Sequence, residues 1–291
     1  MLKRTLLAIF AHPDDESFGM GGTLSLYASR GYHVELICAT RGEAGEISDP
    51  ALGTKEDLPR LRENELRCAA RGMGIRPPRF LGYRDSGMAG TPENDDPRSL
   101  HRADRTEAVG KVVALIRKIK PDVIVTFEPG GGYGHPDHVA IHQITVAAVP
   151  AAADPVAYPE QLTAGLKPHA TPKLYYTALP KRFFRKMAEK LAAAGIDVNQ
   201  VAGVRDGSIA DWGMPDEMVT TVVDVSTVLA KKIEAFGCHR SQLNPSGPFA
   251  MALRLGGEVW SEPMSSEYYQ RVQPPMHPGE PEETDLFAGV A

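Results

Sequence analysis

Two short motifs rich in histidine and aspartate carry the residues best suited to chemistry. The first reads Ala-His-Pro-Asp-Asp-Glu over residues 11–16, and the second reads Gly-His-Pro-Asp-His over residues 134–138. Crowding carboxylates beside an imidazole raises their mutual repulsion, which a divalent cation relieves. His12 and Asp15, three residues apart, can converge on one metal while Asp14 points elsewhere. The alternative for the first motif alone is a polar loop in which Asp14 or Asp15 caps the next helix.

The second motif favours a metal site, because two His-Pro-Asp tripeptides in one chain are hard to explain as two unrelated helix caps. His12, Asp15 and one histidine of the second motif would supply three protein ligands and leave one position open, as in a catalytic zinc site. Asp14 would then be a free carboxylate beside the metal, able to take a proton from water. Spacing leaves the third ligand open, and the candidates are His135, His138 and His142.

The elements that must position these motifs follow the pattern of a parallel α/β sheet. Apolar segments at 5–10 and 123–127 predict the strands that lead into the two motifs. In open sheets of this class, ligands bind beyond the carboxyl ends of the strands. The expected fold is Rossmann-like, with a mostly parallel sheet, helices on both faces and a smaller, irregular C-terminal α+β part. Further strands are expected at 34–40 and 79–83, and helices at 23–30 (after a glycine turn at 19–22), 59–71 and 105–120.

We expect the chain to divide into three parts. Residues 1–170 would form the Rossmann-like, metal-binding catalytic core, and residues 171–272 would complete the sheet and the substrate cleft. Residues 273–291 contain several prolines and acidic residues, which predicts a flexible tail.

Composition predicts a globular, cytoplasmic protein. The chain has 291 residues, of which 42% are hydrophobic, and its net charge is −5, from 32 basic and 37 acidic residues. This charge lacks the basic footprint of a nucleic-acid-binding protein. The apolar runs are far shorter than the ~20 residues of a membrane span, and the N-terminal one is too short for a signal peptide. A homo-oligomer is compatible with the sequence. Neither disulfides nor a cysteine-rich zinc site is expected from the three widely spaced cysteines, Cys38, Cys68 and Cys238.

Taken together, the two motifs resemble those of the LmbE-like (PIG-L) zinc-dependent N-deacetylases. Counterparts of that family's other segments extend the resemblance over residues 6–260. They lie at residues 41–46, 62–66, 82–88 and 239–242. The Tyr-Arg-Asp-Ser-Gly-Met and His-Arg-Ser-Gln segments are most similar to the mycothiol-pathway branch, which comprises the glucosaminyl-inositol deacetylase and the mycothiol S-conjugate amidase.

The resemblance implies one zinc ion per subunit, although iron(II) also suits a site of two histidines and one aspartate. It implies Asp14 as the general base. His135 would stabilise the oxyanion and protonate the leaving amine, with Asp137 orienting its ring. Tyr133 matches a mobile tyrosine that assists the tetrahedral intermediate. The implied zinc ligands are His12, Asp15 and His138.

The resemblance also implies the substrate class. Glu46, Arg62 and Asp85 match positions near the substrate, and the last two would grip sugar hydroxyls. The expected function is N-deacetylation of a small molecule that contains N-acetylglucosamine. Alternatives with the same chemistry are a mycothiol-type S-conjugate amidase and an N-acetylglucosaminyl-malate deacetylase. A non-catalytic, metal-dependent carbohydrate-binding protein is disfavoured, because binding alone has no use for a free Asp14 beside the metal.

Overall fold

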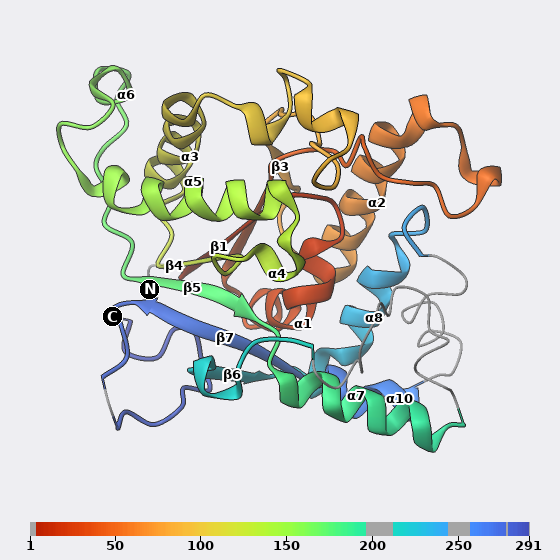
Figure 1. Ribbon diagram of the computed structural model, residues 1–291. Helices are drawn as coiled ribbons and strands as arrows, with labels where there is room; N and C mark the ends of the chain where they lie inside the picture. Colours follow the sequence, from red (N-terminus) through yellow and green to blue (C-terminus); the bar gives the residue numbers. More distant parts are fainter. Residues whose placement is uncertain (1–3, 196–211, 244–256, 278, 291) are drawn as a thin grey trace.

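A seven-stranded sheet forms the centre of the molecule (Figure 1). The structure is a computed structural model that describes residues 4–195, 212–243, 257–277 and 279–290. The strand order is β3-β2-β1-β4-β5-β7-β6, in which the first five strands are parallel and β7 runs antiparallel to β5 and β6. The strands are β1 (Thr5–Phe10), β2 (His33–Cys38), β3 (Arg79–Phe80), β4 (Val123–Thr126), β5 (Lys173–Ala178), β6 (Thr221–Asp224) and β7 (Ser266–Gln273).

Helices cover both faces of the sheet, as the expected fold class requires. The chain steps from β1 to β2 and β3 in one direction and from β4 to β5 in the other. Because parallel crossovers are right-handed, this reversal sends α1 and α2 to one face, with α8, and α3 and α5 to the opposite face (Figure 1). The helices are α1 (Asp15–Ser29), α2 (Leu58–Met73), α3 (Arg105–Ile119), α4 (Gly131–Gly134), α5 (Pro136–Ala153), α6 (Pro159–Thr163), α7 (Lys181–Ala193), α8 (Leu229–Gly237) and α10 (Gly257–Met264).

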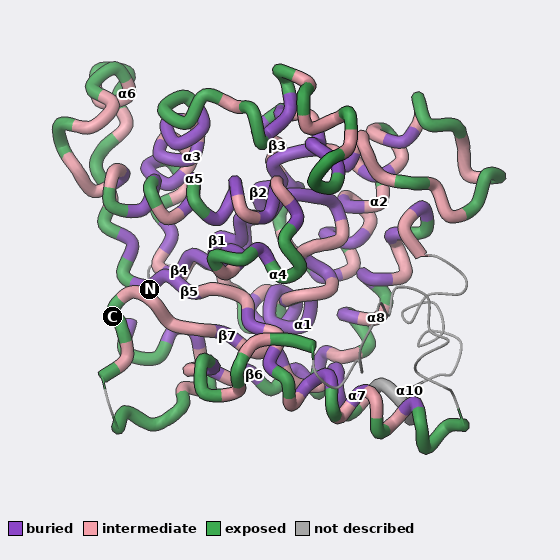
Figure 2. Tube along the Cα trace, in the orientation of Figure 1, coloured by how far each residue is buried: buried purple, intermediate pink, exposed green. Residues whose placement is uncertain are grey.

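The reversal of strand order lies between β1 and β4, the two strands that precede the histidine motifs. Both strands are buried at the centre of the molecule (Figure 2). Their near-continuous apolar sequences follow from this position, because helices cover a parallel sheet on both faces. The point where strand order reverses is where open α/β sheets bind ligands. The fold therefore brings residues 11–16 and 134–138 to one edge of the sheet.

The glycine turn expected at residues 19–22 is confirmed only as a kink, because these residues lie within α1 but Met20 has non-helical dihedral angles (φ −153°, ψ 21°). Gly22 packs against Val225, and a Cβ on Gly22 would come within 2.6 Å of the valine side chain. The missing side chain of Gly22 thus allows α1 to pack closely against Val225, the residue after β6. The spacing of the glycines does not predict this contact.

The flexible tail expected from residue 273 onward is also not observed in the described residues. Leu286 and Phe287 are buried, and the Phe287 ring packs against Tyr27 with 5.0 Å between ring centroids. Glu283 accepts hydrogen bonds from Lys173 at 2.8 Å and from Arg271 at 2.6 Å. These contacts hold the C-terminal segment against the sheet. Composition predicts a flexible tail from the prolines and charges of the segment, and it contains no information about these contacts.

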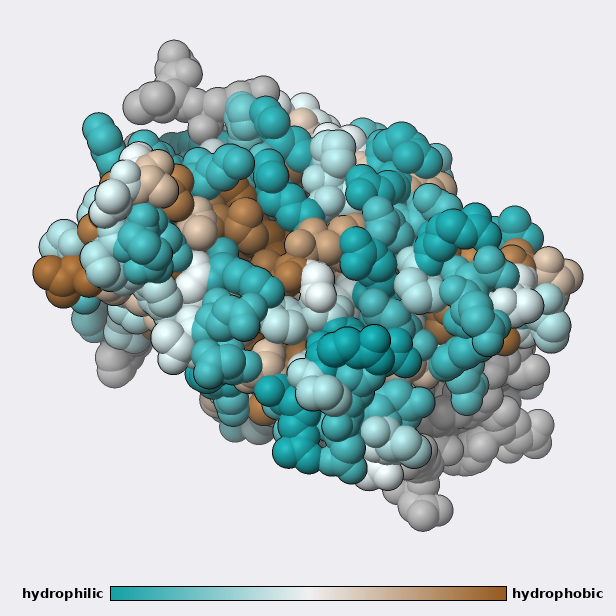
Figure 3. All heavy atoms as spheres, turned by 90° about the horizontal axis from the view of Figure 1, so that it is seen from above, coloured by the Kyte–Doolittle hydropathy of each residue, from teal (hydrophilic) through white to brown (hydrophobic). Residues whose placement is uncertain are grey.

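The face seen from above in Figure 3 is mostly hydrophilic, with a hydrophobic recess near its middle. None of the described helices combines the length and the apolarity that a membrane span requires.

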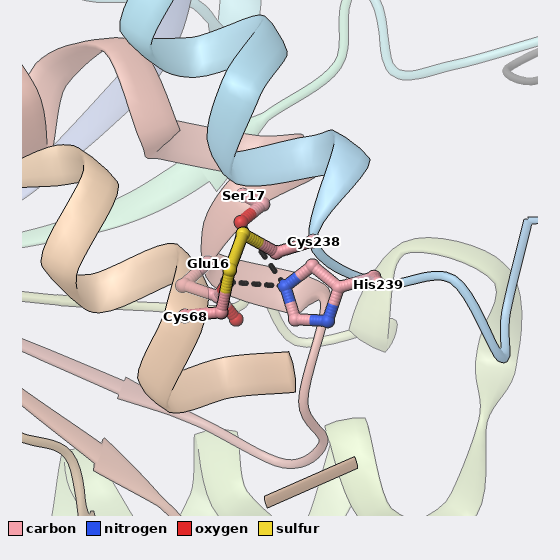
Figure 4. Close-up of a disulfide and its surroundings, with 5 residues drawn as sticks. All are labelled: Glu16, Ser17, Cys68, Cys238 and His239. Atoms are coloured by element: carbon pink, nitrogen blue, oxygen red, sulfur yellow. Dashed lines mark hydrogen bonds and ion pairs between the residues drawn. A yellow bond between two sulfur atoms is a disulfide. The ribbon is translucent and has the colours of Figure 1, made fainter. Parts of the chain in front are cut away.

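Cys68 on α2 and Cys238, directly after α8, form a disulfide (Figure 4). The expectation of no disulfide is therefore wrong. Because α2 packs beside α8, the Cα atoms of two residues 170 positions apart come within 5.8 Å. Cys38 is a buried free thiol.

Candidate metal centre

Three side chains from the two motifs converge at the carboxyl ends of β1 and β4. His12 Nδ1 lies 3.1 Å from His138 Nε2 and 3.7 Å from Asp15 Oδ2, and His138 Nε2 lies 3.3 Å from Asp15 Oδ1. Donor atoms on a tetrahedral zinc, with bonds of about 2.0–2.2 Å, stand roughly 3.3–3.5 Å apart. The 3.3 Å separation falls in this range, whereas 3.1 Å is shorter and 3.7 Å is longer, and Asp15 makes its two contacts through different oxygens. The three residues lie close enough together to hold a divalent metal and leave one coordination position open.

In both His12 and His138, one ring nitrogen contacts other protein groups. These contacts direct the second ring nitrogen toward the point where His12, Asp15 and His138 converge, which we call the convergence point. His12 Nε2 lies 3.2 Å from Asp137 Oδ2 and 3.4 Å from Asp85 Oδ1. His138 Nδ1 lies 3.0 Å from the carbonyl oxygen of Gly131, to which it can donate. Contacts of this kind set the orientation and tautomer of metal-binding histidines. Although burial lowers it, the hydrogen bonds to Asp137 and Asp85 raise the pKa of His12 well above its usual value.

Asp137 occupies a different place from the one the resemblance implies. Its carboxylate contacts His12 and accepts hydrogen bonds from the Ser86 hydroxyl and, at 2.9 Å, from the Ser86 N–H. Its only hydrogen bond to His135 runs from its own backbone N–H to Nδ1, at 3.1 Å. In this structure the Asp137 carboxylate therefore orients His12, and the start of α5 orients His135.

Asp14 is half-buried at the start of α1, close enough to Asp15 and His12 for their charges to shift the pKa of its carboxyl. Burial and the neighbouring Asp15 raise the pKa of its carboxyl to about 6. A base with a pKa close to the working pH combines a large ionised fraction with useful proton affinity. The backbone φ of Asp14 is 124°, a conformation that costs a residue other than glycine of order 1–3 kcal/mol.

His135 and Tyr133 lie over the same edge. Burial, together with the rings of His12 and His138, lowers the pKa of His135 to about 4, so the ring is neutral at pH 7. Because Nδ1 accepts the N–H of Asp137, the ring proton sits on Nε2, which can donate a hydrogen bond. The Tyr133 side chain is 68% exposed, and its ring centroid lies 5.0 Å from that of His138.

His142 lies one turn after His138 on α5 and supports the site from behind. Its Nδ1 lies 2.8 Å from the carbonyl oxygen of Phe127, to which it can donate, and the Phe127 ring stacks on His138 with 4.0 Å between centroids. Sequence reasoning missed Phe127. The signal available was its position directly after β4.

Of the three residues expected near the substrate, Arg62 has the most distinctive surroundings. It lies on α2, is 8% exposed, and passes between Gly42 and Gly45, where any side chain would collide with the guanidinium. Its Nη2 makes one long hydrogen bond of 3.4 Å, to the carbonyl oxygen of Glu46. Among the described residues it has no ion-pair partner, and its charge lowers the pKa of Asp14, which burial and Asp15 raise.

The other two residues expected near the substrate, Asp85 and Glu46, have different surroundings from Arg62. Asp85 is buried and accepts hydrogen bonds from the N–H groups of Ala44 at 3.1 Å and Gly87 at 2.8 Å, in addition to its contact with His12. Glu46 is exposed. The structure thus brings Arg62 and Asp85 to the site and leaves the carboxylate of Glu46 at the surface.

Comparison with known proteins gives consistent matches. A family model described as "PIG-L: GlcNAc-PI de-N-acetylase" matches residues 7–149. A 1D-myo-inositol 2-acetamido-2-deoxy-α-D-glucopyranoside deacetylase from Acidothermus cellulolyticus is 38% identical over 297 residues, which cover 99% of this chain and 95% of the relative.

Two solved structures have a similar fold. An N,N'-diacetylchitobiose deacetylase from Pyrococcus horikoshii superposes with a TM-score of 0.65 at 21% identity, covering 100% of this chain and 87% of that one. A 4-carboxy-2-hydroxymuconate hydratase from Pseudomonas putida gives a TM-score of 0.61 at 21% identity, covering 95% of this chain and 99% of that one. Since these two neighbours carry different activities, the fold alone does not decide the reaction.

Proposed function

Because the chain belongs to the PIG-L (GlcNAc-PI de-N-acetylase) family, we propose that it is a metal-dependent N-deacetylase. The proposed substrate is 1D-myo-inositol 2-acetamido-2-deoxy-α-D-glucopyranoside, from which it would release acetate and leave the free amine. The observation that carries the proposal is the convergence of His12, Asp15 and His138, with a separate carboxylate, Asp14, that interacts electrostatically with Asp15 and His12. The full-length similarity to deacetylases of this substrate supports the choice of amide.

We propose zinc as the metal, with His12, Asp15 and His138 as its ligands. Bound there, zinc would polarise the amide carbonyl and lower the pKa of water to about 7. Four carboxylates surround this point, which gives it the negative charge that attracts a divalent cation. They belong to Asp14, Asp15, Asp85 and Asp137.

The protein's own groups would divide the proton transfers between them. Asp14 would take a proton from the attacking water and later deliver it to the leaving amine. His135, neutral and protonated on Nε2, would donate a hydrogen bond to the developing oxyanion. This differs from the role implied by resemblance, in which His135 protonates the amine, because its low pKa leaves few rings protonated near pH 7. Tyr133, exposed beside His138, would add a second donor to the intermediate.

The substrate would bind on the side of Arg62. A buried guanidinium without an ion-pair partner among the described residues suits the hydroxyl oxygens of a sugar. We propose that the exposed carboxylate of Glu46, on the loop that Arg62 crosses, accepts from another hydroxyl. Asp85 faces inward, so its main role would be to hold His12.

A substrate panel tests the proposed function. Zinc-loaded protein is expected to release acetate from N-acetylglucosaminyl-inositol faster than from N-acetylglucosaminyl-malate, and to leave a mycothiol-type S-conjugate uncut. Chelation should abolish turnover, and zinc should restore it. Preferential cleavage of the S-conjugate would make the protein an amidase of that class, and binding without any cleavage would make it a carbohydrate-binding protein.

Arg62 and Asp85 should respond differently to substitution. Losing a buried partner for a sugar hydroxyl costs about 1–3 kcal/mol, so Arg62→Ala should lower kcat/KM on the sugar substrate roughly ten- to a hundred-fold. Its metal content should stay normal, and its activity on a minimal acetamide should fall much less, because there only the effect of the Arg62 charge on the pKa of Asp14 is lost. Asp85→Asn places an amide nitrogen against N–H donors and should weaken metal affinity roughly ten- to a hundred-fold, with losses on both substrates.

Titration with zinc, together with rates on the two substrates, separates these effects. Equal losses on the sugar and the acetamide in Arg62→Ala would show that Arg62 acts through the fold or through the pKa of Asp14 and does not bind the sugar.

A further inference from the structure

The chain directly after α8 lies behind the first motif and is anchored to α2 at two points. We call residues 238–242 the clamp segment. Cys238 is bound to Cys68 of α2 through the disulfide (Figure 4). Three residues later, the N–H and hydroxyl of Ser241 donate to the carboxylate of Glu65 on α2, at 2.7 and 2.6 Å. The clamp segment is therefore fixed to a helix of the core, and the proposed function gives it no role.

Two other side chains of the clamp segment reach the first motif. His239 is buried, and its Nε2 lies 2.9 Å from Glu16 Oε1, with the ring directed at Glu16 and Ser17 in Figure 4. Gln242 donates through Nε2 to the carbonyl oxygen of Pro13. These contacts are made to the residues on either side of Asp14, so the clamp segment meets the backbone that carries the proposed base.

Gln242 contacts the peptide group between Pro13 and Asp14 directly, and His239 acts on the same peptide group through Glu16. Its carbonyl oxygen accepts from Gln242, and its N–H donates to Glu16 Oε2 at 3.1 Å, on the carboxylate that His239 holds by its other oxygen. Asp14 has a φ of 124°, which a residue other than glycine keeps only where its surroundings enforce it. The carbonyl oxygen of Asp14 is held separately, by the N–H groups at the start of α1.

We propose that His239 is a positioning residue for Asp14. By holding Glu16, its ring fixes the peptide plane before Asp14 and so sets the direction in which the Asp14 carboxylate leaves the backbone. Gln242 holds the other side of the same peptide. This proposal rests on the proposed function, in which Asp14 takes the proton from water. A shift of about 1 Å in a reacting group can cost about a hundred-fold in rate, so such a role has a measurable consequence.

The first test compares three variants of the full-length, zinc-loaded enzyme. His239→Ala is expected to lower kcat roughly ten- to a hundred-fold, with KM and zinc stoichiometry unchanged, because the direction of the base is no longer fixed while the metal ligands stay in place. The variant also removes a charge that lowers the pKa of Asp14. His239→Gln keeps an N–H donor for Glu16 and should recover most of the rate. Gln is neutral too, so recovery by Gln assigns the loss to direction and not to charge. His169→Asn is the matched control, since His169 bonds the Pro121 carbonyl before β4, away from the carboxyl ends of the strands, and should leave kcat unchanged. A loss that appears in KM or zinc content, or that Gln does not recover, overturns the proposal.

The second test asks whether His239 acts through Asp14. In an Asp14→Asn background, His239→Ala should cause no further loss of kcat, because the base that His239 positions is already absent. A further loss of the same size there would overturn the positioning role. Full activity in Asp14→Asn alone would instead overturn the proposed function. If His239→Ala does not fold, Gln242→Ala replaces it, with the same expected fall in kcat at constant KM.

Discussion

His138→Ala is expected to lose its metal and, with it, all measurable deacetylation, while the protein stays folded. Without the imidazole, two of the three proposed ligands remain, His12 and Asp15, and two ligands do not hold zinc at the affinity of a three-ligand site. The measurement is zinc per chain after gel filtration, together with acetate release and the circular dichroism spectrum.

His135→Ala is the matched control for this prediction. This variant also removes a buried imidazole. The Nδ1 of His135 accepts from the backbone N–H of Asp137, and His135 is not a proposed ligand, so zinc should stay bound. Turnover should fall about 10²–10³-fold because an oxyanion donor is lost. The ring nitrogens of His12, His135 and His138 lie within 4.8 Å of one another. A His138→Ala protein that keeps its zinc would therefore make His135 the ligand in place of the one proposed.

Asp14→Asn is expected to lower kcat by roughly 10²–10⁴-fold, the usual contribution of a general base, with zinc retained. The amide has the same size and keeps the position at the start of α1, but it cannot accept a proton. A protein that only binds carbohydrate would keep its sugar affinity in this variant and would show no acetate release in either form.

The same carboxylate predicts the pH dependence of the unaltered enzyme. Burial and Asp15 raise the pKa of Asp14, and a base works only when deprotonated, so kcat/KM should fall as the pH drops through the pKa of this carboxyl. The residual activity of Asp14→Asn should lack this acid limb. An acid limb that persists unchanged in the variant would assign the limb to another group and contradict the role of Asp14 as the base.

The sequence alone determined the sheet-forming core and the location of the site. The run at residues 5–10 is a strand at the same bounds in the structure, because a short, near-continuous apolar run is typical of a strand that is buried on both faces of a parallel sheet. The two motifs directly follow β1 and β4, and parallel strands bring their carboxyl ends to one edge. Local patterns of this kind, read over a few residues, are sufficient for these conclusions.

Only the tertiary structure decided which partner each polar group takes. Spacing left three histidines open. The structure turns His142 to a backbone carbonyl and brings ring nitrogens of both His135 and His138 within 4.8 Å of one on His12. It also gives the Asp137 carboxylate to His12, and it joins Cys68 to Cys238 across 170 positions. Such pairings depend on how α2, α5 and α8 pack on the sheet. They are made across long sequence separations, where no local periodicity records them, and so they become visible only once the chain is folded.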